Sequence, residues 1–316
     1  MKTTTNLINQ NLAWLLEGDV SIAYQVKRDL LGADINELSA LQGRIATSGW
    51  GCNMLTARRP DGHWGREFYQ PKWTCTHYTL LDLKTLRLPP SNQACRETVR
   101  MILTKEPNPD GGLAYAKTIS ISDICVDGMF LGTAAHFEIE EDLLKNTVDL
   151  LLRTVLPEGG WNCLYHKGDH HFSVHTTINV LEGLSGYCQA GYRYRLSEAE
   201  KAIAAGEEQL LTHKLYQSHR TGKTIDPKMT MLSFPSRWRY DILRALDYFY
   251  FANRSYDPRM AEALEIIKAK RRKDGTWPLQ ARHPGKVHFN MEQPGKPSRW
   301  NTLRALRVLK HFEQVV

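Results

Sequence analysis

Apolar positions along this chain follow the spacing of helices that bury one face. The clearest pattern is a duplication, in which Pro-Ser-Arg-Trp occurs at 235–238 and again at 297–300. Each copy leads, with an offset of two residues, into Leu-Arg-Ala-Leu at 243–246 and 303–306. Proline and serine supply a stop and an N-cap, and apolar residues then recur three and four positions apart. The pattern predicts a duplicated helix start.

Weaker helix starts of the same kind lie upstream. They are Asp19–Ile22, Trp73–His77, Ser122–Cys125 and Ser173–Thr176, which makes six starts spaced about 50 to 62 residues apart. More polar amphipathic segments lie between them, at 92–105, 141–155, 197–213 and 258–272. Several of these segments end at a glycine-aromatic turn: Asp61–Trp64, Glu158–Trp161, Asp274–Trp277 and a degenerate copy, Asp110–Leu113. Glycine accepts the positive φ that ends a helix, and the tryptophan then packs across the seam to the next hairpin.

Six helical hairpins at this period predict an all-α fold, an (α/α)6 toroid or barrel, because strand signals are nearly absent. An open solenoid of similar hairpins is the alternative. Closure is favoured because the expected inner helices carry polar as well as apolar residues, as the lining of a central cavity would. No domain boundary is visible, so residues 1–316 are expected to form one domain, with surface loops at 89–90 and 283–297.

Composition narrows the function classes. The chain has 316 residues, 42% hydrophobic and 24% charged, which suits a buried core and excludes a disordered tail. Its net charge of +7 permits an anionic partner, but the basic residues are scattered, so we expect no nucleic acid. No apolar run approaches a membrane span, and 1–10 lacks a signal sequence, so we expect a cytoplasmic protein. Six cysteines without a CxxC pair are expected to be reduced thiols.

The hairpin period, the Asp-Gly-x-Trp turns and the run Ser-Arg-Trp-Asn-Thr-Leu-Arg-Ala-Leu at 298–306 resemble the terpenoid cyclase and protein prenyltransferase superfamily. The resemblance covers residues 15–312 and is closest to bacterial squalene-cyclase-like or prenyltransferase-repeat proteins. It implies an α/α toroid. The Asp-x-Asp-Asp acid of proton-initiated cyclases and the Asp-Asp-x-x-Asp cluster of ionisation-type synthases are both missing, which disfavours proton-initiated cyclisation.

The resemblance also implies a metal site. Protein prenyltransferases hold zinc with an Asp and a Cys two residues apart and a His at the next inner-helix start, and Asp123, Cys125 and His175 match that order. A thiolate, an imidazole and a carboxylate make a tetrahedral zinc site with one open position. The structural alternative is a buried small cysteine, a helix cap and a core histidine.

Other polar and aromatic residues at the inner-helix starts are candidates for the same cavity. His77 and Lys117 resemble positions where prenyltransferases place diphosphate-binding groups. We expect catalytic roles for Asp123, Asp127, His77 and Tyr78, and substrate binding by Lys117, Arg237, Arg239, Asp241, Arg299, Trp73, Trp238 and Trp300. The tryptophans would form a wall that stabilises carbocations. Ion pairing, capping and packing within the repeats are the alternative roles.

The function expected from these features is an enzyme. Zinc beside a central apolar cavity would act on an isoprenoid or similar hydrophobic substrate carrying a phosphate or carboxylate, by transfer or cyclisation. A helical partner subunit is compatible with the resemblance. Two alternatives stay open. One is a non-catalytic toroid that binds a ligand or partner; the other is a carbohydrate-active (α/α)6 enzyme, which would need a pair of carboxylates in the cavity.

Overall fold

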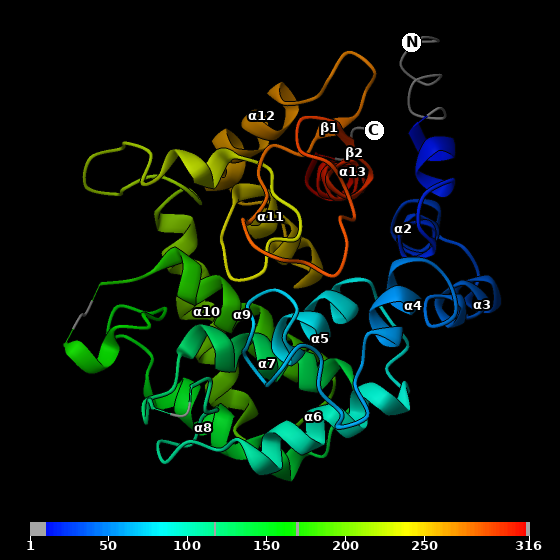
Figure 1. Cartoon of the computed structure of the whole chain (residues 1–316). Helices are drawn as coiled ribbons and strands as arrows, with labels where there is room; N and C mark the ends of the chain where they lie inside the picture. Colours follow the sequence, from blue (N-terminus) through cyan, green and yellow to red (C-terminus); the bar gives the residue numbers. More distant parts are fainter. Residues whose placement is uncertain (1–10, 117, 169–170, 314–316) are drawn as a thin grey trace.

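The computed structural model describes residues 11–116, 118–168 and 171–313, and within them the fold is all-α, as predicted (Figure 1). Six helices begin at or close to the predicted starts: α2 Val20–Val26, α5 Thr76–Thr85, α7 Ile124–His136, α9 Val174–Gln189, α11 Ile242–Phe251 and α13 Arg299–Glu313. Four start after a side-chain cap, in which Asp19, Asp123, Ser173 and Asp241 accept a backbone N–H of the first turn.

These six helices are neighbours in chain order. Contacts join α5 to α7, α7 to α9, α9 to α11, α11 to α13, and α13 back to α2. A hydrogen bond joins α2 to α5: the side-chain amide of Gln25 donates to the carbonyl of Thr85 at the end of α5 (3.2 Å). The first and last helices of this set, α2 and α13, are therefore in contact. In an open solenoid the two ends lie apart.

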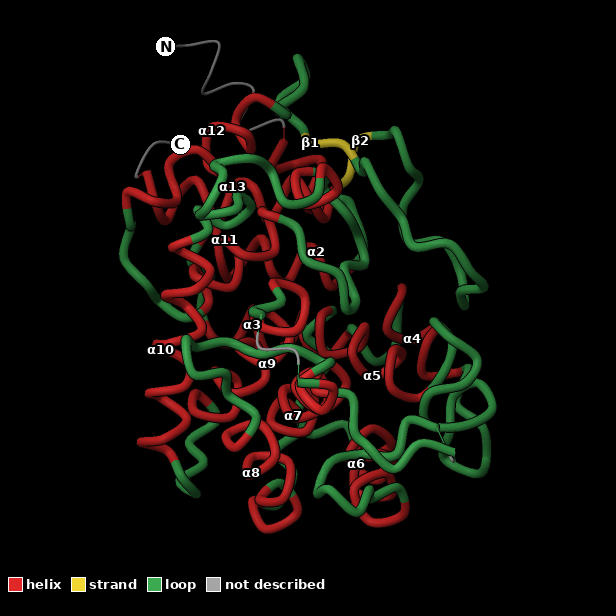
Figure 2. Tube along the Cα trace, turned by 90° about the vertical axis from the view of Figure 1, so that its left-hand side faces the viewer, coloured by secondary structure: helices red, strands yellow, loops and turns green. Residues whose placement is uncertain are grey.

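A second set of helices lies outside the first, and their sequence is more polar, with one buried face. They are α3 Ile35–Arg44, α6 Gln93–Lys105, α8 Lys145–Arg153, α10 Leu196–Thr212 and α12 Ala261–Ala269, with α4 Gly49–Thr56 between α3 and α5. Figure 2 shows the same helices at right angles to the first view, connected by long loops. Single-turn helices lie at Lys27–Leu31, Glu141–Leu143, Tyr165–Lys167, Pro227–Thr230 and Pro258–Met260.

Strand structure in the described residues is limited to one two-residue pair. β1 Trp277–Pro278 lies antiparallel to β2 Pro297–Ser298, with Trp277 opposite Ser298. In the part of the chain described, no helix is both long and apolar enough to cross a membrane.

Three glycine-aromatic turns join α4, α8 and α12 to the inner helix that follows each of them. Trp64, Trp161 and Trp277 are fully buried, and each indole N–H donates to the carbonyl ten residues earlier, on Met54, Leu151 and Ile267 (2.6 to 2.7 Å). The backbone N–H of the same three tryptophans donates to the hydroxyl groups of Thr76, Thr177 and Thr302 (2.9 to 3.1 Å). In the degenerate copy, Leu113 replaces the tryptophan, and its N–H donates to Asp127 instead (2.9 Å).

Glycines let α7 and α9 approach closely. A Cβ on Gly183 would lie 2.2 Å from the carbonyl oxygen of Gly128, and a Cβ on Gly128 would lie 2.8 Å from Val180 Cα. No other residue fits at either position without displacing backbone, so this pair of helices depends on glycine at both points.

Candidate functional site

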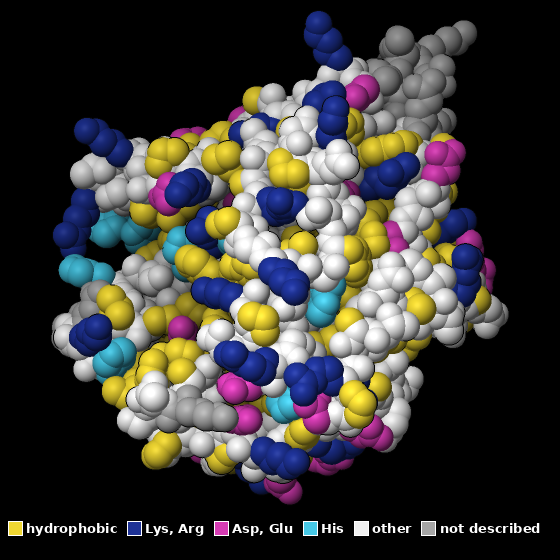
Figure 3. All heavy atoms as spheres, viewed as in Figure 1, with side chains coloured by type: hydrophobic (Ala, Val, Ile, Leu, Met, Phe, Trp, Pro, Cys, Tyr) yellow, Lys and Arg dark blue, Asp and Glu magenta, His cyan; other side chains and the backbone are white. Residues whose placement is uncertain are grey.

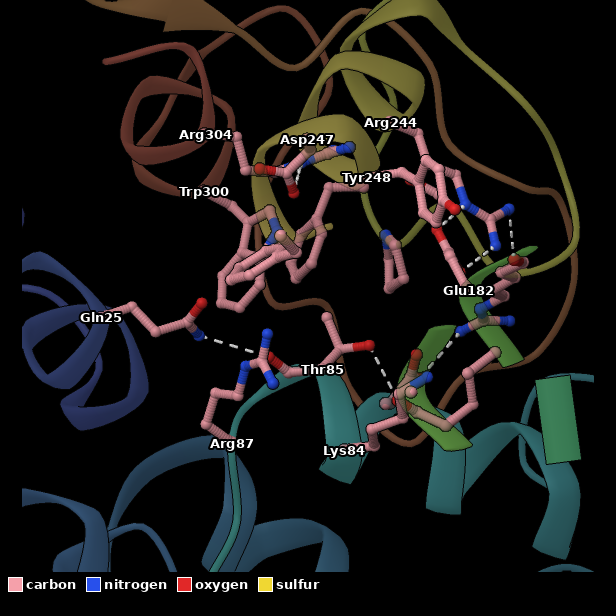
Figure 4. A pocket seen from close by; sticks show the side chains of 18 of the residues that line it. Gln25, Lys84, Thr85, Arg87, Glu182, Arg244, Asp247, Tyr248, Trp300 and Arg304 are labelled. Carbon is pink, nitrogen blue, oxygen red and sulfur yellow. Dashed lines mark hydrogen bonds and ion pairs between the residues drawn. The ribbon is translucent and has the colours of Figure 1, made fainter. Parts of the chain in front are cut away.

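A charged cavity of about 190 Å³ lies inside the ring of inner helices. Its wall is formed by the C-terminal part of α5, by α9, α11 and α13, by Gln25 of α2, and by the segment 234–237 that precedes α11 (Figure 4). Aromatic side chains form one part of the wall: Phe234, Tyr248, Phe251 and Trp300. Basic side chains outnumber acidic ones: Lys84, Arg87, Arg237, Arg244, Arg304 and Arg307 face Asp82, Glu182 and Asp247.

Ion pairs join the charged residues of neighbouring inner helices. Arg244 of α11 donates two hydrogen bonds to Glu182 of α9 (2.8 and 2.7 Å). Asp247 of α11 accepts from Arg304 (3.2 Å) and Arg307 (2.5 Å) of α13. Arg307 also donates to Asp29, which follows α2 (3.0 Å). All of these side chains are largely buried, so a low local dielectric strengthens each pair.

Lys84 and Arg87 differ from the other cations of the cavity. Neither makes an ion pair or a side-chain hydrogen bond with any described residue, although both line the cavity (Figure 4). The Arg87 guanidinium lies 4.6 Å from the ring centre of Phe251. Arg87 follows the end of α5 and has a left-handed backbone conformation (φ +64°). Burial lowers the pKa of Lys84 to about 8 and contributes most to lowering the pKa of Arg87 to about 10.

Arg237 and Asp82 form a second charged feature of the wall. The guanidinium of Arg237 lies 4.4 Å from the ring of Trp73, and its Nη2 lies 3.7 Å from Asp82. Arg237 is 6% exposed, and its Nε and Nη1 have no hydrogen-bond partner among the described residues. Burial raises the pKa of Asp82 to about 6, and the nearby Arg237 only partly opposes this. The cavity thus offers free guanidinium donors beside a carboxyl that binds a proton near neutral pH.

Apolar side chains fill the space next to this cavity. Trp73, Cys75, Tyr78, Leu81 and Met129 form a small buried cluster separate from the main core. The segment 283–288 covers it: the Trp73 indole donates to the carbonyl of Pro284 (2.6 Å), His288 shares a hydrogen bond with Thr79 (2.9 Å), and Val287 packs against the cluster. The segment 283–297, expected as a surface loop, therefore packs on the inner helices through its first part.

Two of the predicted catalytic residues lie in that apolar region. His77 is 1% exposed, is surrounded by the rings of Phe68, Tyr78 and Phe130, and has no hydrogen-bond partner on either ring nitrogen among the described residues. Burial lowers the pKa of His77 to about 3, so the imidazole is neutral. The Tyr78 hydroxyl bonds to the Tyr69 hydroxyl (2.9 Å). Neither residue lines the charged cavity.

Asp127, another predicted catalytic residue, is fully buried and takes the place of threonine in the degenerate turn. One carboxyl oxygen accepts the N–H of Leu113, and the other has no partner among the described residues. Burial raises the pKa of Asp127 well above its usual range. The position supports a packing role.

The predicted substrate-binding residues are dispersed. Arg237 and Trp300 line the charged cavity, and Trp73 borders it. Asp241 caps α11 through the N–H of Arg244 (2.8 Å). The remaining residues lie elsewhere: Arg239 lies over the ring of Trp238, Trp238 contacts the His175 ring, and Arg299 donates to the carbonyl of Trp14. Lys117 falls outside the described residues.

The residues expected to bind zinc are not gathered in the predicted combination. Asp123 and Cys125 lie together, but Cys163 completes their group, and the ligand atoms of these three lie within 4.8 Å of one another. His175 instead accepts the N–H of Tyr240 on its Nδ1 (2.9 Å). Tetrahedral zinc would hold two thiolates about 3.8 Å apart, whereas the two sulfurs here are 2.9 Å apart. Two thiolates and a carboxylate are ligands that zinc accepts, but the two sulfurs would have to separate by about 0.9 Å to hold it. Zinc stays a prediction of the resemblance.

Sequence reasoning missed the charged residues that line the cavity. The arginine of Leu-Arg-Ala-Leu is Arg244 in one copy and Arg304 in the other, and both face the cavity. The signal was present, because an arginine between leucines on an otherwise apolar helix face must find a buried partner. The same signal marks Asp82 in α5 and Glu182 in α9.

The outer surface does not add a second basic site in the view of Figure 3. Lys and Arg side chains are dispersed there among acidic, apolar and uncharged groups.

Comparison with known proteins finds structural similarity without sequence matches. No family description and no curated protein sequence matches the chain. The structure is similar to that of a variant of the type II terpene cyclase MstE from Scytonema in complex with merosterolic acid A (TM-score 0.45, 16% identity, covering 96% of this chain and 95% of that one). A second MstE variant, in complex with geranylgeranyl dihydroxybenzoate, gives a TM-score of 0.43 at 16% identity and covers 96% of each chain.

Proposed function

We propose that this protein is an enzyme that binds an organic anion with a hydrophobic portion in the cavity inside the ring. The observation that carries the proposal is the pair of cations, Lys84 and Arg87, that line the cavity and form no ion pair with a described residue. Glu182 is near enough to raise the pKa of Lys84, but burial lowers this pKa by more. A buried charge that lacks a partner is costly, and a bound anion would supply one.

The charge of the wall indicates a ligand with more than one negative charge. Six basic and three acidic side chains line the cavity, an excess of three positive charges. Asp29 contacts Arg307 from outside the wall, but it is also paired with Arg28 (2.5 Å). Lys84 and Arg87 account for two of the excess positive charges. A phosphate monoester or a diphosphate matches this excess, because several guanidinium and ammonium donors can share the phosphate oxygens.

The aromatic part of the wall suits the hydrophobic portion of such a ligand. Trp300 stacks on Phe234 at 4.4 Å between ring centres, and Tyr248 and Phe251 continue the same surface. Aromatic rings provide apolar area and also attract positive charge through their faces. An isoprenoid or similar phosphorylated molecule, the substrate class implied by the resemblance, combines these two portions.

Asp82 is the proposed acid–base group. It is buried beside the free donors of Arg237, and its pKa of about 6 allows it to hold or release a proton at physiological pH. Glu182 and Asp247 are held by arginines, so they are poor candidates for the paired carboxylates of a carbohydrate-active enzyme.

Binding of diphosphate tests the proposal. Calorimetry with inorganic diphosphate and with a prenyl diphosphate is expected to detect binding to the wild-type protein, about tenfold weakened in K84Q and in R87Q. Arg299→Gln is the matched control, because Arg299 belongs to the duplicated motif but donates to Trp14 outside the cavity. Absence of binding by the wild type, or an equal loss in R299Q, would contradict the proposal. Binding without turnover of any prenyl diphosphate would favour a ligand-binding protein instead.

A further inference from the structure

Two cysteines from different parts of the chain lie in direct contact. Cys125 is in the first turn of α7, and Cys163 follows the turn that contains Trp161. Their sulfur atoms are 2.9 Å apart, and both side chains are half-buried. No other pair of cysteines in the described residues shows such a contact.

We infer that Cys125 and Cys163 form a redox-active thiol pair that a disulfide oxidant such as glutathione disulfide converts to an intramolecular disulfide. The inference is independent of the proposed anion site, because neither cysteine lines the charged cavity.

The surroundings of the two sulfurs hold them in contact. Thr176 of α9 places its hydroxyl 3.5 Å from Cys125 Sγ and 3.4 Å from Cys163 Sγ, and Asp123 lies 3.0 Å from Cys163 Sγ. These contacts keep the sulfurs together. Forming the bond requires only that two touching atoms close further, to about 2.05 Å. Tetrahedral zinc would have to separate them to about 3.8 Å.

The reaction balances with the oxidant named. The contact with Cys125, burial and the neighbouring Asp123 raise the pKa of the Cys163 thiol, so Cys125 makes the first attack. As its thiolate, Cys125 attacks a sulfur of glutathione disulfide and displaces one molecule of glutathione thiolate, which leaves a mixed disulfide on the protein. The second cysteine attacks the protein sulfur of that mixed disulfide and releases the second glutathione. Two cysteine thiols are oxidised, one glutathione disulfide is reduced to two glutathione molecules, and the two cysteine protons pass through solvent to the released thiolates.

The disulfide would tie the loop after Trp161 to the start of α7. The cross-link joins residues 38 positions apart, and a closed loop of that size restricts the unfolded chain. We therefore expect the melting temperature to rise by about 5 °C on oxidation and to return on reduction.

Mass spectrometry of the full-length, chelator-treated protein tests the inference. After incubation with glutathione disulfide, we expect the intact protein to lose two hydrogens, and peptide mapping to find the cross-link between 125 and 163. C163S and C125S are expected to lose the cross-link and the rise in melting temperature. C188S is the matched control, because Cys188 is also half-buried but lies outside the pair, and it is expected to behave as the wild type.

Three outcomes would overturn the inference. The first is a protein whose mass does not change under oxidant that converts a model dithiol peptide. The second is a cross-link that involves a different cysteine. The third is one equivalent of zinc in the protein as purified that is absent from C163S, which would make the group a metal site. Peptide mapping of the wild type decides the first two even if a variant fails to fold.

Discussion

Replacing Asp82 with asparagine tests both the burial of this carboxyl and its proposed role. In the folded protein the pKa of Asp82 is raised from 3.8 to about 6 by burial. A carboxyl whose pKa is raised by folding stabilises the protein below the unfolded pKa, and this stabilisation is lost as the pH rises through the folded pKa. A difference of about two units corresponds to about 3 kcal/mol. D82N removes the titrating group, so this part of the pH dependence should disappear.

Urea unfolding followed by tryptophan fluorescence measures the effect, over a range from about pH 3.5 to about pH 8 that includes both pKa values. The unfolding free energy of the wild type relative to D82N is expected to fall by about 2 kcal/mol between about pH 4 and about pH 7. Subtraction cancels the other titrating groups, and D142N, at an exposed carboxyl, serves as the control. Parallel curves for the wild type and D82N would refute the reasoning and remove Asp82 as an acid that is protonated near pH 6.

The packing of the hairpins leads to three further predictions. Thr177→Val leaves the buried N–H of Trp161 without its acceptor and should lower the unfolding free energy in urea by about 2 kcal/mol. Gly183→Ala would place a Cβ 2.2 Å from the carbonyl oxygen of Gly128, and calorimetry should show a lower melting temperature, with a cost of about 3 kcal/mol. The wild type should lose stability as the pH rises, because burial raises the pKa of Asp127, and Asp127→Asn should remove this loss. Urea unfolding at about pH 8, where D127N should be more stable than the wild type, checks the sign.

Local rules were sufficient to predict most of the helices. Capping residues such as Asp123 and Ser173 precede apolar residues at helical spacing, and both cap helices in the structure. The amphipathic segments 92–105 and 197–213 correspond to α6 and α10. These features depend on residues within one or two turns, so the sequence pattern contains the information needed.

The cavity could not be predicted in the same way. The two Pro-Ser-Arg-Trp copies differ in structure, because Arg237 has a left-handed backbone (φ +52°) and lies five residues before α11, whereas Arg299 is the first residue of α13. A repeated motif therefore places one arginine in the cavity and the other on Trp14. Lys84 and Arg87 lie at the end of a helix, where basic residues are common for electrostatic reasons alone, so their sequence position gives no functional signal.

The helices that the ion pairs join distinguish cations that stabilise the fold from cations proposed to bind a ligand. Ion pairs link α9 to α11, α11 to α13, and α13 to the turn after α2, but none involves Lys84 on α5. Arg244→Met would leave Glu182 buried without its partner, which should cost about 3 to 5 kcal/mol of stability.

Lys84→Met removes an ammonium group that forms no ion pair with the described residues and whose pKa burial lowers to about 8. The unfolding free energy should therefore stay unchanged or rise, while diphosphate binding should weaken about tenfold. Paired measurements of urea unfolding and calorimetric binding separate these effects. If K84M loses as much stability as R244M, the ammonium group stabilises the fold and the proposed anion site loses one of its two defining cations.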